Sequence, residues 1–294
     1  MDIVITGASG LIGPLAVGRL SQAHTVYALV RHVPARPELP NVSWVTCDLA
    51  QPWDGAGLPA HADVIIHLAQ SRRFRDFPDA ATDMFAVNVA STLHLLEYAR
   101  QVRARQFIYA SSGGVYGSGP RPFTESDALQ AHSRLNFYLM TKAHAEELVH
   151  KYAAFFVTTI LRPFFVYGPA QHHQMLMPRL VQSVREGQPI RLAGPAGIRI
   201  NPIYNLDFVE VLERCLALQE ACTLNVAGGE ILSIRQIGEV IGAVVGKTAR
   251  FTVDAGAGSD LVADIRQLER LLGYRPQVSL HTGISQICQA DGMC

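Results

Sequence analysis

The sequence predicts an α/β protein, with a Rossmann-type doubly wound parallel sheet and a smaller C-terminal lobe. Two observations predict this fold. Short β-branched apolar runs alternate with helical segments from the N-terminus to Pro163, as expected of repeated βαβ units. In addition, a turn containing Gly7, Gly10 and Gly13 directly follows the first apolar run and opens a helix, which is the arrangement of a dinucleotide-binding turn.

The expected elements follow from the periodicity of the apolar residues. Strands are expected at residues 2–6, 25–30, 43–46, 64–68, 106–110 and 157–161, and helices near residues 14–22, 84–100 and 138–155. From Tyr167 on, short segments rich in proline and glycine alternate with helices near residues 175–186 and 234–245. We therefore expect a dinucleotide-binding domain of residues 1–166 and about 201–227, and a smaller lobe of residues 167–200 and 228–294.

Composition and charge narrow the class of protein. The chain has 294 residues, of which 49% are hydrophobic and 17% charged, as is typical of a soluble globular protein. Lysine plus arginine equals aspartate plus glutamate at 25 each, and no long basic block predicts a nucleic-acid partner. The apolar start lacks a preceding basic region, and the longest uncharged apolar stretch is too short to cross a bilayer. We expect a cytoplasmic protein without a membrane or nucleic-acid partner.

Cysteines and histidines give no sign of a metal site. The five cysteines include no Cys-x-x-Cys pair, so we expect reduced and mostly buried thiols: Cys47, Cys215, Cys222, Cys288 and Cys294. The eleven histidines include the neighbours His172 and His173, but no His-x-x-x-His pair stands with a carboxylate. The sequence therefore predicts no metal ligands.

The glycine-rich turn is the first candidate binding site. Without side chains, its glycines let backbone N–H groups approach a pyrophosphate at the positive end of the following helix. A glycine-rich turn without a ligand is the alternative. The candidate residues are Gly7, Ser9, Gly10, Leu11, Ile12 and Gly13.

The end of the second strand bears on the choice of dinucleotide. An acidic residue about 20 residues after the glycines would bind the adenosine ribose 2′-hydroxyl of NAD. Arg31 occupies that region, with Arg36 close behind and no carboxylate before Glu38. Because an arginine would pair with a 2′-phosphate, the sequence favours NADP over NAD. Alternatively, Arg31 is a solvated loop residue.

The third and fourth strands also end in candidate cofactor contacts, since ligands bind at the carboxyl ends of strands in such sheets. Asp48, followed by Leu49, could accept a hydrogen bond from the adenine amino group, or it could equally be a helix N-cap. After the fourth strand, Leu68, Ala69 and Gln70 allow the cofactor to approach the backbone.

A set of three residues carries the candidate chemistry. Tyr138 and Lys142 are four residues apart on an expected helix, so they share one face. A nearby ammonium favours phenolate and lowers the tyrosine pKa, which makes Tyr138 a candidate general acid and base. Lys142 can also hold the nicotinamide ribose. Ser112, after the fifth strand, could bind the same substrate oxygen as Tyr138.

Together these segments resemble the extended short-chain dehydrogenase/reductases, and specifically the NAD-dependent epimerase/dehydratase family. The resemblance spans nearly the whole chain. The matching segments are Thr6–Gly13, Asp48–Leu49, Val64–Ala69, Asn88–Val89, Ser111–Gly117, Tyr138 with Lys142, Leu161–Pro169, Asp207 and Leu271–Pro276.

The resemblance implies a fold, a reaction and a set of roles. It implies catalytic Ser112, Tyr138 and Lys142, hydride transfer at a carbinol or ketone carbon, and a C-terminal lobe that binds a nucleotide-linked sugar. It also implies a homodimer formed through the helices near 84–100 and 138–155. Further cofactor contacts are expected at Ala110, Pro163 and Phe165, and substrate contacts at Ser112, Gly113, Phe165, His172, Arg179 and Tyr204.

Two departures from the family pattern bear on the substrate and the reaction. Phe165 stands where many members that act on nucleotide sugars have an asparagine, and its ring cannot donate that hydrogen bond. Gly113 and Gly114 stand where dehydratases have an acidic pair. We expect an NAD(P)-dependent epimerase or reductase. The alternative is a non-catalytic NADP sensor or scaffold on the same fold, against which the complete catalytic set argues.

Overall fold

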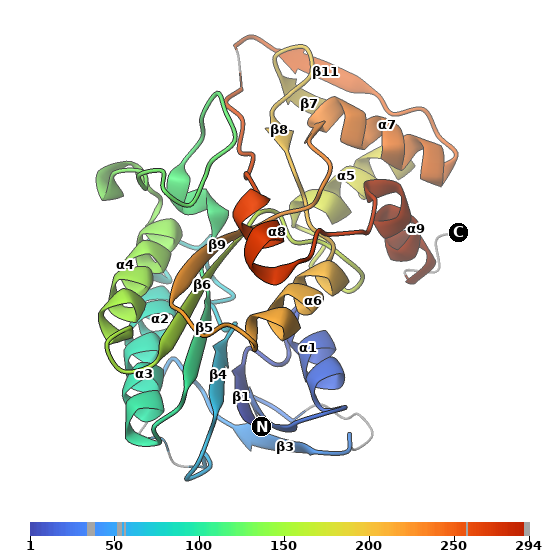
Figure 1. Ribbon diagram of the computed structural model, residues 1–294. Coiled ribbons are helices and arrows are strands. Elements are labelled where there is room, and N and C mark those ends of the chain that lie inside the picture. The colour runs from blue at the N-terminus through green and yellow to red at the C-terminus, as the bar shows by residue number, and fades with distance from the viewer. Residues whose placement is uncertain (34–38, 52–54, 56, 257, 291–294) are drawn as a thin grey trace. The chain divides into compact units, whose positions relative to one another are not determined.

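The computed structural model describes residues 1–33, 39–51, 55, 57–256 and 258–290. Arg36, Glu38 and Cys294 lie outside these residues. The chain forms two compact units (Figure 1). Unit 1 comprises residues 1–115, 129–162 and 209–224, and unit 2 comprises residues 116–128, 163–208 and the chain from residue 225 onward.

A seven-stranded sheet forms the centre of unit 1, in the order β3-β2-β1-β4-β5-β6-β9. Its strands are β1 (Asp2–Thr6), β2 (Thr25–Val30), β3 (Val42–Thr46), β4 (Val64–His67), β5 (Gln106–Ala110), β6 (Val157–Pro163) and β9 (Cys222–Val226). All pairings from β3 to β6 are parallel. The strand order reverses between β1 and β4, which is the position where open α/β sheets bind ligands. The predicted Rossmann-type sheet is confirmed.

Helices cover both faces of this sheet (Figure 1). On one face lie α3 (Ser91–Gln101) and α4 (Phe137–Tyr152), and on the other lie α1 (Gly13–Leu20) and the unit 1 part of α6 (Asn205–Cys215). The strands β1, β4 and β5 are almost entirely buried, which explains their continuous apolar runs. The core between the sheet and α3 and α4 includes Val4, Ile65, Leu95, Leu96, Phe107, Tyr109, Ala145 and Val149.

The helix expected near residues 84–100 is divided into three segments. It consists of α2 (Ala81–Phe85), a π-helical turn (Ala86–Ala90) and α3. The π-helical turn contains Asn88, whose side chain is fully buried. π-Helical turns inserted into α-helices are rare and occur frequently at functional sites.

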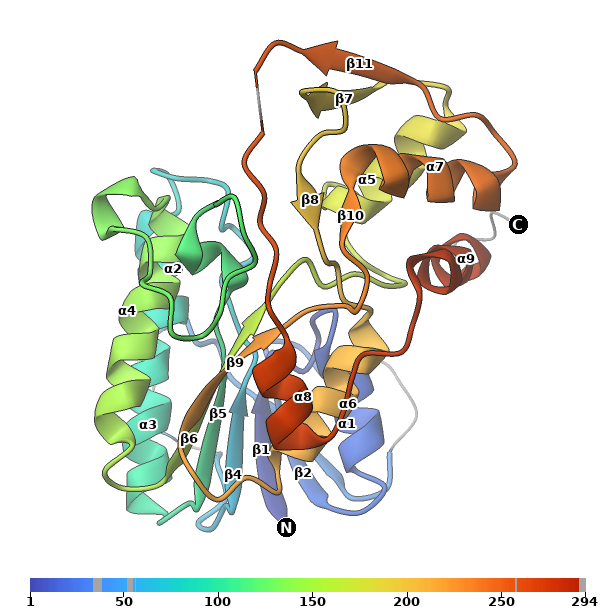
Figure 2. The ribbon, with the colours of Figure 1, turned by 45° about the horizontal axis from the view of Figure 1, so that its top comes forward.

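Unit 2 contains two small sheets and several helices (Figure 2). The strand β7 (Ile190–Ala193) pairs in parallel with β11 (Phe251–Asp254), and β8 (Arg199–Ile200) pairs antiparallel with β10 (Leu232–Ser233). Its helices include α5 (Leu176–Arg185), α7 (Ile234–Val245), α8 (Arg266–Leu272) and α9 (Leu280–Ala290). The apolar faces of α5, α7 and α9, together with β7, form a separate core, which includes Met177, Val181, Leu192, Ile237, Ile241 and Ile284.

Residues 116–128 belong to unit 2 although they follow β5 in the sequence. Isolated bridges join Gly119 to Asp260 and Phe123 to Ala263. The ring of Tyr116 stacks on that of Phe123 with centroids 5.0 Å apart. This segment therefore belongs to unit 2 because it pairs with residues about 140 positions later in the chain. Such long-range pairing leaves no local signal in the sequence.

Two further expectations concern membranes and thiols. Among the described residues, no helix combines the length and the apolar composition that crossing a lipid bilayer requires. Cys47 and Cys215 are buried thiols, and burial raises the pKa of Cys47 to about 11.

Candidate active site

The turn after β1 packs directly on the backbone that follows β4. Gly7 has a φ of +71°, which glycine adopts without strain. A Cβ at this position would lie 2.8 Å from the Ala69 nitrogen and 2.9 Å from the Leu68 carbonyl carbon. The glycine at position 7 is therefore required by both conformation and space.

The other two glycines of the turn differ from each other. A Cβ on Gly13 would lie 2.2 Å from the Gly7 oxygen, so this glycine is required where α1 crosses the turn. Gly10 is exposed, and a Cβ there would meet only the Gly7 oxygen, at 3.3 Å. Packing therefore excludes a side chain at positions 7 and 13, whereas position 10 has room for a small one after a slight adjustment.

The N-terminus of α1 fits an anionic ligand. The N-cap residue is Ile12, whose apolar side chain cannot accept a hydrogen bond from the first turn. That turn also has no acidic residue. The first N–H groups of a helix carry a partial positive charge and need acceptors. With Ser9, Gly10 and half-buried Leu11 at the surface, these N–H groups can hold a pyrophosphate.

The candidates after β2 and β3 lie at the same edge of the sheet, since these strands are parallel neighbours. Arg31 directly follows β2 and is exposed. The Oδ1 atom of Asp48 accepts a hydrogen bond from the Ala50 nitrogen at 3.1 Å, and no helix begins here. The N-cap alternative for Asp48 was therefore wrong, because its side chain closes a local turn instead. Leu49 packs against the unit 1 core.

A chain of hydrogen bonds links the glycine-rich turn to α3. The Ala69 N–H donates to Thr6 Oγ1 at 3.2 Å, and Thr6 Oγ1 lies 2.6 Å from His67 Nδ1. His67 Nε2 lies 3.0 Å from Thr92 Oγ1, which itself donates to the Asn88 carbonyl at 2.8 Å. Because the Thr92 hydroxyl donates to Asn88, Thr92 Oγ1 accepts from His67 Nε2, which therefore carries a proton; in the neutral ring, Nδ1 then accepts from the Thr6 hydroxyl.

The electrostatics of His67 agree with this assignment. Its side chain is fully buried, and burial, with a smaller contribution from Lys142, lowers its pKa to about 3. His67 is therefore a fixed hydrogen-bonding residue and not a proton carrier at neutral pH.

Asn88 joins the loop after β4 to α4. Its Oδ1 accepts a hydrogen bond from the Ser71 nitrogen at 2.9 Å, and its Nδ2 donates to Thr141 Oγ1 at 2.9 Å. Thr141 Oγ1 donates in turn to the Tyr138 carbonyl at 2.7 Å. The π-helical turn that contains Asn88 thus fixes α4 between Tyr138 and Lys142.

Tyr138 and Lys142 stand at the centre of these contacts. The Tyr138 hydroxyl donates to Gln70 Oε1 at 2.7 Å. Lys142 is 1% exposed, and its Nζ donates to the Ala110 carbonyl at 2.8 Å and lies 5.0 Å from the centre of the Tyr109 ring. Three of the sequence-predicted residues, Ala69, Gln70 and Tyr138, therefore lie in one chain of hydrogen bonds, while Lys142 and Ala110 form a separate pair.

The pKa values of Tyr138 and Lys142 are both shifted, and that of Tyr138 differs from the sequence expectation. Burial lowers the pKa of Lys142 to about 7, partly opposed by the carboxylate of Glu146. Burial raises the pKa of Tyr138 well above its ordinary value, whereas the sequence analysis expected a lowered value. The cause is desolvation of the phenolate, because Lys142 Nζ donates to Ala110 and not to the Tyr138 oxygen.

Ser112 and the two glycines after it lie beside α4. Ser112 is half-buried, and its Oγ accepts a hydrogen bond from the Gly114 nitrogen at 3.1 Å. Gly113 is buried in a short 3-10 helix, Gly113–Tyr116. A Cβ on Gly114 would lie 2.8 Å from the Leu139 side chain, so this glycine lets Ser112 approach the start of α4.

A buried ion pair lies one turn beyond Lys142. Glu146 and Arg162 are only 2% and 6% exposed in their side chains, and Arg162 Nη2 lies 2.6 Å from Glu146 Oε2. Arg162 Nε lies 3.1 Å from Oε1 of the same carboxylate. This pair was not predicted from the sequence, although the four-residue spacing from Tyr138 to Lys142 to Glu146 indicates a shared helix face.

The remaining sequence-predicted residues belong to unit 2, namely Pro163, Phe165, His172, Arg179 and Tyr204. Arg179 is exposed on α5, and His172 is exposed with its ring stacked on that of His173 at 4.3 Å. Tyr204 is 3% exposed and packs edge-on against Tyr167, with ring centroids 5.5 Å apart.

Phe165 has an unusual backbone conformation. Its φ is +48°, in the left-handed region that disfavours most side chains and in which asparagine is enriched. Its ring is half-buried and packs against the unit 2 core. The backbone here is therefore the one that the family's asparagine favours, while the side chain is apolar.

Asp207 contacts the C-terminal segment, residues 271–276, in which the sequence also resembles the family. Its carboxylate accepts hydrogen bonds from the Tyr274 hydroxyl and from the backbone nitrogens of Gln277 and Val278, the latter at 2.9 Å. Asp207 thereby fixes the segment between α8 and α9 within unit 2.

Comparisons with known proteins agree with this geometry. The family described as "NAD dependent epimerase/dehydratase family" matches residues 3–227. An uncharacterized UDP-glucose epimerase, YtcB, of Bacillus subtilis (strain 168) is 28% identical over 97% of this chain and 96% of its own length. A dTDP-4-dehydro-6-deoxy-D-allose reductase of Streptomyces bikiniensis is 25% identical over 97% of this chain and 94% of its own length.

A solved structure extends the similarity to three dimensions. UDP-glucuronic acid 4-epimerase from Bacillus cereus, in complex with UDP-glucuronic acid and NAD, superimposes with a TM-score of 0.86 at 25% identity and with 100% of both chains covered. The family match covers well over half of the sequence and includes the glycine-rich turn, Ser112, Tyr138 and Lys142. The chain therefore belongs to the NAD-dependent epimerase/dehydratase family.

Proposed function

We propose that the protein is an enzyme that transfers a hydride, with NAD(P), at a carbinol or ketone carbon of a nucleotide-linked sugar, as an epimerase or a reductase. The observation that carries this proposal is the buried Lys142, held at Ala110 one helical turn from Tyr138. Burying a lysine is costly, and its ammonium stands where it can bind a ribose and act on the tyrosine.

The residues of unit 1 fit a nicotinamide dinucleotide. Ser9, Gly10 and the N-terminus of α1 would hold its pyrophosphate, Asp48 its adenine, Ala69, Gln70 and Ala110 its central part, and Lys142 the nicotinamide ribose. When bound, the nicotinamide supplies an acceptor and donor of hydride. For Pro163 and Phe165, a cofactor contact is proposed from the family resemblance alone.

The chain's own residues would handle the proton. Ser112 would hold the substrate oxygen, and Tyr138 would take its proton during oxidation and return it during reduction. For this role the Tyr138 pKa must fall toward neutrality. That requires a charged Lys142 and displacement of Gln70 from the Tyr138 hydroxyl, which it now contacts at 2.7 Å.

A finer proposal concerns NADP. Exposed Arg31 at the end of β2 supports it, while the Bacillus cereus relative binds NAD. Calorimetric titration with both dinucleotides tests it. Arg31→Asp should weaken NADP binding by about 1.5–3 kcal/mol. Arg103→Asp is the matched control, because exposed Arg103 precedes β5 at the opposite edge of the sheet. NAD binding as tight as NADP binding would refute the preference.

Assembly and location form part of the same proposal. We propose a homodimer through the helical segments near residues 84–100 and 138–155, supported by the family resemblance and by the exposed apolar residues Phe85 (51%) and Leu93 (39%) in the first of them. We also propose a cytoplasmic location, supported by the buried thiols of Cys47 and Cys215, which form no disulfide. Light scattering of the purified protein tests the dimer.

Incubation with UDP- and dTDP-linked hexoses tests the activity. With catalytic NAD(P), a 4-epimerase yields the epimeric nucleotide sugar, whereas a reductase consumes stoichiometric NAD(P)H with a keto-sugar. A non-catalytic sensor would bind the dinucleotide and produce neither result. The UDP-linked hexoses are tested first because UDP-sugar epimerases are among the relatives.

A further inference from the structure

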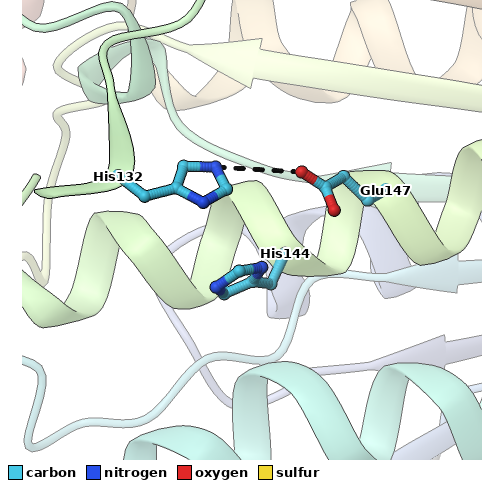
Figure 3. Close-up of side chains that lie close together, drawn as sticks. All are labelled: His132, His144 and Glu147. Carbon is cyan, nitrogen blue, oxygen red and sulfur yellow. Dashed lines mark ion pairs between the residues drawn. The ribbon is translucent and has the colours of Figure 1, made fainter.

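We propose that the chain binds one divalent transition-metal ion, of the Zn²⁺ class, at His132, His144 and Glu147 on the outer side of α4. This site goes beyond the proposed hydride transfer and does not depend on it. Among the described residues, these three form a group whose ligand atoms all lie within 4.8 Å of one another. Figure 3 shows the three side chains close together.

Two different elements supply the ligands. His144 and Glu147 are three residues apart on α4 and therefore share a face. His132 comes from a short 3-10 helix, His132–Arg134, that precedes α4. Its Nε2 lies 3.8 Å from Glu147 Oε1, and its ring meets that of His144 edge-on with centroids 4.7 Å apart.

The spacing is close to what an ion requires. Ligand atoms at about 2.0–2.2 Å from a tetrahedral ion lie about 3.4 Å from one another. Contraction from 4.8 Å therefore needs movements of about 1 Å or less in each side chain, and His132 and His144 are only half-buried while Glu147 is exposed.

The donor set identifies the class of ion. Two imidazoles with one carboxylate suit Zn²⁺, Ni²⁺ or Cu²⁺, whereas Mg²⁺ and Ca²⁺ require oxygen ligands throughout. Three protein ligands leave at least one coordination position for water. The sequence gives no short-range sign of this site, because His132 is twelve residues from His144.

The site is separate from the proposed active site. Residues of an α-helix are about 100° apart, so His144 lies about 200° around α4 from Lys142. An ion here would not touch the reacting atoms. The ion would connect the 3-10 helix to α4. It would therefore stabilise the connecting residues 135–137, which directly precede Tyr138, against local unfolding.

Zinc titration of the untagged protein, in competition with a chromophoric chelator, tests the proposal. We expect one Zn²⁺ per chain and no competition by Mg²⁺. His144→Ala and Glu147→Gln should each weaken binding by about tenfold or more, since even changes behind the ligands cost that much. His150→Ala is the matched control, because His150 is exposed on the same helix outside the group and should leave affinity unchanged.

Two further measurements keep the result unambiguous. Cobalt should give a visible d–d spectrum with the wild type that the double variant His132→Ala/His144→Ala abolishes, while far-ultraviolet circular dichroism confirms that this variant is folded. Zinc should raise the thermal midpoint of the wild type and not that of the double variant. The proposal is overturned if the double variant binds zinc as tightly as the wild type, or if one ion binds per two chains.

Discussion

The turn after β1 in unit 1 and the segment after β6 in unit 2 differ in how their residues fit the backbone. After β1, the residue at positive φ is a glycine, Gly7. After β6, the residues at positive φ are Phe165 at +48° and Ala170 at +63°, both with side chains that oppose this conformation. In the first region the backbone explains the residue type. In the second region the side chain is retained against the backbone preference, so we infer that the ring of Phe165 has a role of its own.

The largest effect should come from Tyr138 in unit 1. Tyr138→Phe removes the proton and little volume, so turnover should fall by about 10²–10⁴-fold, the usual contribution of general acid–base catalysis. Dinucleotide affinity should not change. Steady-state rates and calorimetry measure the two quantities, and near-normal turnover in this variant would contradict the proposed role.

Breaking the buried ion pair should have the largest effect on stability. Glu146→Gln leaves the guanidinium of Arg162 buried opposite a neutral group, and the free energy of unfolding should fall by about 3–5 kcal/mol. Asp76→Asn is the matched control, since it breaks the exposed pair with Arg73 and should cost about 0–1 kcal/mol. Equal losses in the two variants, measured by urea unfolding, would show that burial of the pair does not matter.

Substitutions at two glycines of the turn should affect different properties: Gly7→Ala stability, and Gly10→Ala dinucleotide binding. Gly7→Ala places a side chain at positive φ against the backbone of Ala69, so it should destabilise the protein by about 1–2 kcal/mol or more. Gly10→Ala should change stability by about 0.5 kcal/mol or less, as exposed substitutions usually do, but should weaken dinucleotide binding. Unchanged affinity in Gly10→Ala would remove the argument that the turn is a binding site.

These contrasts show which parts of the molecule the sequence could predict. The Rossmann sheet was predictable because β1, β4 and β5 are buried on both faces and read as apolar runs. Tyr138 and Lys142 were predictable because four residues make one helical turn. The roles of Asn88, His67 and Arg162 were not, since their partners lie far away in the sequence, as for Asn88 and Thr141 at 53 residues.

The lysine should also make stability depend on pH. The folded-state pKa of Lys142 is about 7, below its ordinary value of 10.5, so between these values the unfolded chain binds the proton and the folded chain does not. The free energy of unfolding should therefore rise with pH from about 7 to about 10.5, apart from other groups. Lys142→Met should reduce this slope in urea titrations at several pH values. An identical slope in both proteins would mean that Lys142 is not desolvated.

The smallest effect should come from Phe165 in unit 2. Phe165→Asn and Phe165→Ala both remove the ring, but only asparagine is at ease at positive φ. The asparagine variant should therefore be more stable than the alanine variant by about 1 kcal/mol. If both variants keep the substrate profile of the wild type, the ring does not select the substrate, and our inference from the comparison above is wrong.

The most direct test of the central claim is the redox state of the bound dinucleotide during reaction. The protein, loaded with the oxidised dinucleotide that it binds more tightly, is mixed with UDP-glucose or UDP-glucuronic acid and followed by the absorbance of reduced nicotinamide. A transient or stable reduced signal is expected in the wild type, and a rise at least about 10²-fold slower in Tyr138→Phe. A loaded protein that shows no reduced nicotinamide and no product with any UDP- or dTDP-linked hexose would contradict the claim.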